Sequence, residues 1–93
     1  MRRILLLTLD LKGPSGSYAP LYEAIKRQGS WWHYLNWTWL LQTVNSPDQI
    51  VAELSPHLQT ADRLFVTPVT RPYQGWLPKD AWAWINERAG DIR

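Results

Sequence analysis

The stretch from Trp31 to Thr43, WWHYLNWTWLLQT, constrains the fold most, because it holds four of the chain's seven tryptophans. Aromatic and branched aliphatic side chains flank the pair Asn36-Trp37 on both sides, and such residues favour β-strands. Asparagine tolerates the left-handed backbone of a tight turn. The stretch therefore predicts a β-hairpin that turns at Asn36-Trp37.

The register of this hairpin sorts its side chains onto two faces of a sheet. We expect Leu35 to pair with Thr38, Tyr34 with Trp39, and His33 with Leu40. The set predicted to face the core is Trp32, Tyr34, Trp39 and Leu41. The set predicted to face away from it is Trp31, His33, Leu35, Thr38, Leu40 and Gln42. A chain of 93 residues buries only about 60–65% of its unfolded surface, so large core rings are needed.

The remaining elements follow from periodicity and from helix-end signals. Residues 3–11 alternate with period two and predict a buried strand, and residues 18–28 have helical spacing. The sequence SPDQ at 46–49 is a capping box with proline at the first helical position, which predicts a second helix. RLFVTPV at 63–69 predicts a fourth strand, and Pro68 places it at a sheet edge. Residues 78–88 predict a C-terminal helix.

The order of these elements is β-α-β-β-α-β followed by a helix, which predicts an α+β, ferredoxin-like fold with a four-stranded antiparallel sheet. Right-handed crossovers place the first and third strands in the middle and both helices on one face, which leaves the other face open. We predict a single domain over residues 1–93, with a core of about 3–70 and a C-terminal helix of about 78–88.

Composition excludes several classes of protein. The net charge of +2 is too small to identify a nucleic-acid-binding protein by itself, and Arg2 and Arg3 are expected to be a solvated chain end. The chain has no cysteine, and its two histidines lack the spacing of a paired-ligand site, so a disulfide framework and a zinc ribbon are excluded. The apolar run before Asp10 is too short to span a bilayer. We expect a cytoplasmic protein with no membrane partner.

Asp10 is the candidate catalytic residue, because it ends a central strand on the open face. We expect Trp31, His33 and Gln42 to lie within reach of it, and Arg63 to approach it from the fourth strand. One carboxylate is a weak site for Mg²⁺. A homodimer could bring two Asp10 side chains together around one ion, and the metal would then polarise a phosphate and activate water.

Other interpretations of these residues stay open. An Asp that closes a strand before a Gly-Pro turn commonly caps its own backbone, and His33 is either a proton carrier or a strand residue bonded to a neighbour. KGPSGS, after the first strand, lacks the Lys-Ser/Thr ending of a P-loop. An RNA-binding sheet would need exposed aromatic residues on its central strands, and the first strand has none.

The pattern also resembles a known superfamily. LLLTLDLKGPS, a hairpin, a capped helix and TADRLFVTPV together resemble the second core CRISPR-associated protein and the VapD toxins. YEAIKRQGSWWHYLNWTWLLQT with DRLFVTPV is more similar to small bacterial proteins described as SinR-like, over about residues 3–70. The resemblance implies a ferredoxin-like homodimer and, in the CRISPR-associated family, a metal-binding aspartate that corresponds to Asp10. The arginine-rich segment that often follows that aspartate is here LKGPSGSYAP, with one lysine.

Two functions are therefore predicted. The first is a small dimeric module that binds nucleic acid or a protein partner, with Trp31, Trp37, Gln42 and Arg63 as contact residues. The alternative is a Mg²⁺-dependent endoribonuclease with paired Asp10 side chains as metal ligands and His33 as proton carrier. The low basic charge and the missing arginine segment favour the first.

Overall fold

The computed structural model describes residues 1–93, apart from the side chain of Tyr34. The predicted core-facing placement of that side chain lies outside the described part. The strands are β1 (Arg3–Asp10), β2 (Ser30–Leu35), β3 (Thr38–Thr43) and β4 (Arg63–Pro68). The helices are α1 (Ala19–Lys26), α2 (Pro47–Leu54) and α3 (Lys79–Glu87), with short 3₁₀ turns at Ser15–Tyr18, Ser55–His57 and Ala89–Asp91.

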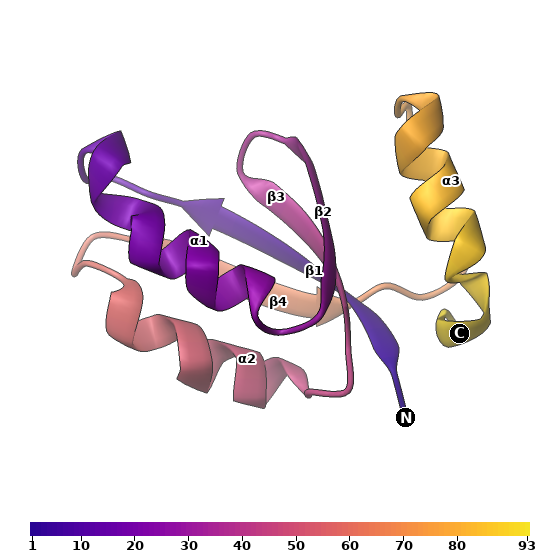
Figure 1. Cartoon of the computed structure of the whole chain (residues 1–93), viewed down its shortest axis with the longest axis horizontal. Coiled ribbons are helices and arrows are strands. Elements are labelled where there is room, and N and C mark those ends of the chain that lie inside the picture. Colours follow the sequence, from indigo (N-terminus) through magenta and orange to yellow (C-terminus); the bar gives the residue numbers. More distant parts are fainter.

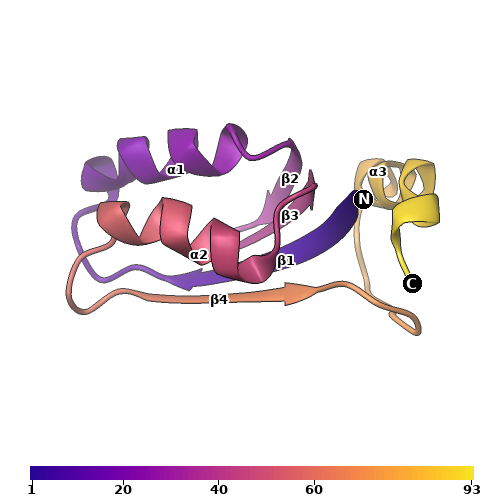
Figure 2. The same ribbon diagram turned by 90° about the horizontal axis from the view of Figure 1, so that it is seen from below.

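The four strands form one antiparallel sheet in the order β2-β3-β1-β4, which confirms the predicted fold class. β1 and β3 are central, and β4 lies at an edge, as Pro68 predicted. Helices α1 and α2 lie together on one side of the sheet (Figure 1; Figure 2). Their apolar stripes bury Leu21, Ile25, Ile50 and Leu54 against the sheet.

Local sequence signals fix where the helices begin. Ser46 caps α2: its side chain accepts from the backbone N–H of Gln49, and the Gln49 side chain accepts from the N–H of Ser46. This reciprocal pair satisfies two backbone donors that the first helical turn leaves without partners. Gly29 ends the segment after α1 at a positive φ of 155°, where its missing Cβ lets the backbone pass close to the carbonyl of Gln42.

The second face of the sheet is not open along its whole length, contrary to the prediction. α3 and the turn that follows it pack on the end of this face where β1 begins (Figure 1). The buried side chains of this second core are Ile4, Trp32, Leu40, Ala81, Ile85 and Ile92. The sheet therefore separates two apolar cores, and α3 leaves the other half of the face uncovered.

A β-bulge overturns the predicted faces of two tryptophans. Leu35 pairs with Thr38 as predicted, but Trp32 pairs with Leu40, so the register shifts between Trp32 and Leu35. One extra residue in a strand reverses the side to which the preceding residues point. Trp32 consequently packs beneath α3 in the second core, and Trp31 lies on the α1/α2 side. Trp39 and Leu41 face α1 and α2 as predicted.

Candidate functional site

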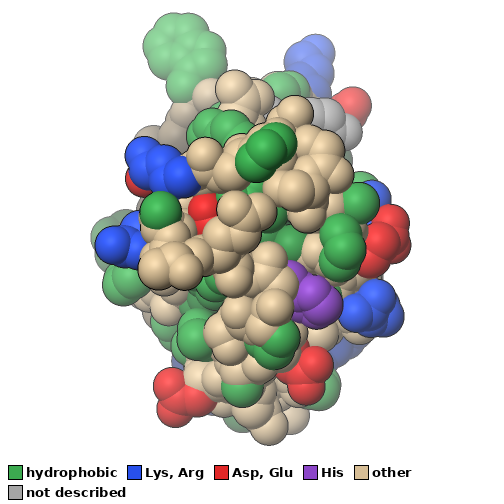
Figure 3. All heavy atoms as spheres, turned by 90° about the vertical axis from the view of Figure 1, so that its left-hand side faces the viewer, with side chains coloured by type: hydrophobic (Ala, Val, Ile, Leu, Met, Phe, Trp, Pro, Cys, Tyr) green, Lys and Arg blue, Asp and Glu red, His purple; other side chains and the backbone are tan. Residues whose placement is uncertain are grey.

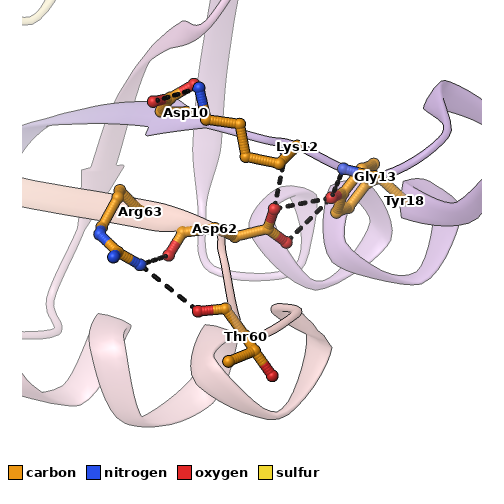
Figure 4. A network of polar contacts seen from close by, with 7 residues as sticks. All are labelled: Asp10, Lys12, Gly13, Tyr18, Thr60, Asp62 and Arg63. Carbon is orange, nitrogen blue, oxygen red and sulfur yellow. Dashed lines mark hydrogen bonds and ion pairs between the residues drawn. The ribbon is translucent and has the colours of Figure 1, made fainter.

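Asp10 ends β1 on the uncovered half of the sheet, as predicted. Its side chain is 60% exposed, and one carboxylate oxygen lies 3.2 Å from the Nζ of Lys12. Arg63 is its cross-strand neighbour on β4, also as predicted, although its guanidinium donates to the backbone carbonyls of Thr60 and Asp62 (Figure 4). The strand end therefore presents one acidic and two basic side chains to solvent.

The loop after Asp10 is held by a buried carboxylate, Asp62. It accepts hydrogen bonds from the backbone N–H of Lys12 at 2.8 Å and from the Tyr18 hydroxyl at 2.8 and 2.9 Å (Figure 4). It also accepts one from the backbone N–H of Gln59 at 2.8 Å. The Tyr18 oxygen in turn accepts from the N–H of Gly13. A Cβ at Gly13 would lie 2.8 Å from that oxygen, so only glycine fits. The network fixes the loop that positions Lys12 beside Asp10.

These contacts shift the pKa of Asp62 and the pKa of Tyr18 in opposite directions, which keeps Asp62 charged and Tyr18 neutral. Burial acts to raise the pKa of Asp62, but the donors from Lys12, Gln59 and Tyr18 and the charge of Arg63 outweigh it, so this pKa lies below its ordinary value. Burial raises the pKa of Tyr18 above its ordinary value, and its hydrogen bond to Asp62 adds to the effect. Asp62 thus serves as a charged acceptor and Tyr18 as its neutral donor.

Trp31, His33 and Gln42 do not lie beside Asp10, so the predicted grouping is wrong. β1 and β3 are antiparallel, with Ile4 opposite Gln42 and Thr8 opposite Thr38. The end of β1 therefore meets the start of β3 and the hairpin turn, where the N–H of Leu9 donates to the carbonyl of Trp37. Gln42 lies at the other end of the sheet, where its side chain donates to Asp91 and accepts from Arg88.

Trp31 and His33 belong instead to an aromatic cluster on the α1/α2 side. The ring of His33 stacks on Trp39 at 3.8 Å, and Trp31 is tilted against Trp39 at 5.4 Å. The Nζ of Lys26 lies 5.1 Å from the Trp31 ring. His33 Nε2 is 3.0 Å from the carbonyl oxygen of Asn36, which is the bond to a neighbour that one interpretation of this residue expected.

The uncovered half of the second face carries a row of four residues that are direct neighbours across the strands. We call it the uncovered row, and it consists of Leu35, Thr38, Thr8 and Phe65. Its two ends are apolar and exposed, with Leu35 at 45% and Phe65 at 63%. Trp37, predicted as a contact residue, is exposed nearby at the hairpin turn. Apolar side chains aligned on one sheet face are a surface suited to a protein partner.

Phe65 and Asp62 are two residues of this region that were not predicted as part of a site. Phe65 alternates with Leu64 and Val66, so its outward direction could have been inferred once the fourth strand was placed. Asp62 lies in the connection between the turn at Ser55–His57 and β4. An acidic residue directly before a buried strand is a signal, but its partners Tyr18 and Gln59 come from distant positions.

The charged neighbours of Asp10 at this strand end are the basic residues Lys12 and Arg63. Among the described residues, no group of three or more His, Asp or Glu side chains is arranged to hold a metal ion. The end of the molecule shown in Figure 3 carries interspersed acidic and basic side chains, so neither charge forms a continuous patch there.

Comparison with known proteins identifies no relative: no protein-family model, curated protein or solved structure matches the chain significantly. Among the residues that the structure describes, no helix has the length and apolar character needed to cross a membrane.

Proposed function

We propose that this protein is a cytoplasmic, homodimeric interaction module that associates through the uncovered row, with a fold shared with the SinR-like group. The observation that carries the proposal is the exposed position of Leu35 and Phe65 on a sheet face that α3 covers only in part. Burial of a large apolar side chain from water contributes about 1.5–3 kcal/mol. With a two-fold axis between β1 and β4, Phe65 of each copy would supply the apolar contact of the interface, and Leu35 on β2 would lie beyond the partner's edge strand.

The second copy is favoured as the occupant because the charges beside the row are self-complementary. Asp10 and Arg63 are neighbours on β1 and β4 at the end of the row. A two-fold axis that runs between these strands, parallel to them, would place each Asp10 opposite the partner's Arg63. The same axis would place each Phe65 opposite the partner's Thr8. The surface is therefore complementary in charge to a second copy of itself, as a two-fold interface requires.

Sedimentation equilibrium over a wide range of protein concentration tests the proposal. Phe65→Ser should weaken dimerisation about tenfold or more, since it removes an apolar contact from each copy. Val44→Ser is the matched control, because Val44 is also 63% exposed but lies outside the row, and it should leave the dimerisation constant unchanged. A protein that stays monomeric, or equal effects of the two variants, would contradict the proposal.

Charge reversal tests the direction of the axis. Asp10→Lys and Arg63→Glu should each weaken the dimer about tenfold, and the double variant should restore it, because the ion pair is re-formed with opposite polarity. Failure of the double variant to restore the dimer would exclude an axis parallel to β1 and β4.

A metal-dependent endoribonuclease is the second candidate, and the exposed carboxylate of Asp10 at the end of the same face favours it. A two-fold axis across the strands, near Asp10, would place the two carboxylates together, where Mg²⁺ would relieve their repulsion. In that arrangement Asp10→Asn should strengthen the dimer without metal and abolish Mg²⁺-dependent RNA cleavage. Wild-type protein that cleaves no RNA with Mg²⁺ or Mn²⁺ would rule this candidate out.

A further inference from the structure

The end of the molecule opposite Asp10 gathers most of the chain's arginines. The structure brings Arg2 and Arg3 from the start of β1 together with Arg88 and Arg93 from the C-terminal segment, around two adjacent pockets. The views in Figures 1 and 2 agree that the two marked chain ends lie near each other there. Arg2 and Arg3 were predicted to be a solvated chain end, and the fold instead brings them together with Arg93 around one pocket.

The two pockets differ in charge. The smaller is lined by Arg2 and Arg88 but also by Glu87 and Asp91, so its charges cancel. The larger, of about 320 Å³, is lined by Arg2, Arg3 and Arg93 with Asp91 as its one acidic residue. We call this larger cavity the arginine pocket. Three guanidinium groups against one carboxylate leave it with a net charge of +2, which favours an anion.

Asp91 is already engaged on one side of the arginine pocket. Its Oδ2 accepts a 2.6 Å hydrogen bond from Gln42 and lies 3.7 Å from the Nε of Arg2. Among the described residues, Arg3 has no ion-pair or side-chain hydrogen-bond partner, and the Arg93 guanidinium contacts only the sulfur of Met1 through its side chain. Arg3 and Arg93 are therefore the two arginines of the lining that no carboxylate engages among the described residues. Guanidinium groups bind phosphate through paired N–H donors.

The floor and walls of the arginine pocket are apolar and held in place. Pro68, Val69 and Thr70 line it above the buried side chain of Ile4. The N–H of Val69 donates to the carbonyl of Ile4 at 2.8 Å, which continues the β1–β4 pairing beyond the strands. The Arg71 side chain donates to the carbonyls of Ile92 and Ala89 at 2.6 and 3.2 Å, and its backbone N–H to that of Arg93. These bonds fix the C-terminal wall before any ligand arrives.

From this arrangement we propose that the arginine pocket binds a phosphorylated nucleoside, with the phosphate on Arg3 and Arg93 and the base or sugar against Pro68 and Val69. The volume lies near the lower end of the range of about 300–1,000 Å³ seen for small-molecule sites, which suits a single nucleotide unit. That unit can be a free mononucleotide or the phosphorylated end of a single-stranded RNA. The site shares no residue with the uncovered row, so it does not depend on dimerisation there.

Calorimetric titration with adenosine 5′-monophosphate, adenosine and inorganic phosphate tests the proposal. The monophosphate should bind at least about tenfold more tightly than either fragment, because each fragment reaches only half of the pocket. Amide chemical shifts of Val69 and Thr70 should move on titration with the monophosphate. Equal binding of adenosine and its monophosphate, or shift changes confined to another part of the chain, would overturn the assignment.

Arginine variants with a matched control locate the phosphate. Arg3→Gln and Arg93→Gln should each weaken binding of the monophosphate about tenfold, with unchanged circular dichroism. Arg27→Gln removes the same charge from an exposed position at the end of α1, outside the pocket, and should have no effect. An equal loss in all three variants would mean non-specific charge attraction and would overturn the site.

A short RNA with a 5′-phosphate, compared with the same RNA ending in a 5′-hydroxyl, distinguishes the two sources of the ligand. Tighter binding of the phosphorylated RNA than of the free monophosphate supports a polynucleotide end as the ligand. Binding of the monophosphate alone supports a free nucleotide. The absence of binding by both would overturn the proposal.

Discussion

Trp39 and Trp31 show at the residue scale how neighbouring rings differ in their contribution to stability. Trp39 is buried between Tyr22, His33 and Trp31 beneath the helices, whereas Trp31 is 42% exposed. Trp39→Ala should lower the free energy of unfolding by about 3–5 kcal/mol, since it leaves a large cavity. Trp31→Ala should cost clearly less. Urea titrations measure both, and equal costs would contradict the placement of Trp31 at the rim of the core.

Asp62 makes stability dependent on pH in a predictable direction. Its pKa is depressed in the folded protein, so its contribution is present above the pKa of the unfolded carboxyl, about 3.9, and is lost as the pH falls through the folded value. The urea concentration at the unfolding midpoint of the wild type should therefore decrease when the pH is lowered below about 4. Asp62→Asn should lower the urea midpoint at pH 7. It should also reduce the decrease of the midpoint at low pH, which we call the acid limb.

Glu53→Gln is the control for this experiment, because Glu53 is an exposed carboxylate near the end of α2. It should leave both the midpoint at pH 7 and the shape of the acid limb unchanged. An acid limb that persists at full size in Asp62→Asn would show that other carboxylates carry the pH dependence.

At the scale of elements, the start of α2 rests on the capping box of Ser46 and Gln49. Ser46→Ala should lower the free energy of unfolding by about 1 kcal/mol, because the N–H of Gln49 loses its acceptor. Ser55→Ala, just after the last residue of α2, removes a hydroxyl that caps no helix start and should cost much less. Chemical denaturation of both variants checks the difference, and equal costs would argue against the box.

The elements were predictable where the signal is local, and unpredictable where it depends on spacing across strands. The capping box, Pro68 at the edge and the alternation of β1 each depend on a few adjacent residues, and all three predictions are confirmed. The bulge between Trp32 and Leu35 cannot be predicted from the residue types of β2 alone. It depends on which side chains the cores on both faces of the sheet can bury. Trp32 is needed beneath α3 while Trp31 and His33 contact Trp39.

The candidate site was predicted less well than the fold. Asp10 and Arg63 were placed correctly, because both flank strand ends that pair directly. Trp31 and Gln42 were assigned to the wrong end of the sheet, since an antiparallel neighbour ends where β1 begins. His33 lies near the hairpin turn, but its ring stacks on Trp39 on the opposite face from Asp10. The arginine pocket could not have been predicted, because Arg2, Arg3 and Arg93 come from opposite ends of the sequence.

The whole molecule divides its polar chemistry between two ends. The end near Asp10 combines the uncovered row with one acidic residue and two basic ones, and it suits a second protein surface. The opposite end holds the arginine pocket and suits a phosphate. A dimer formed at the first end would leave both copies of the second exposed. Two such sites in one assembly would raise the avidity for a ligand that carries two phosphates at a matching separation.

The pairing of β1 with β4 also has a consequence for biosynthesis. The ribosome makes β1 long before residues 63–68, so one side of this central strand lacks its neighbour through most of translation. During that time Leu5, Leu7 and Leu9 belong to a nascent chain whose sheet has an unfinished apolar edge, and such edges recruit strands from other chains. The yield of folded protein should therefore depend on how quickly β4 follows, and on chaperones that shield β1 until it arrives.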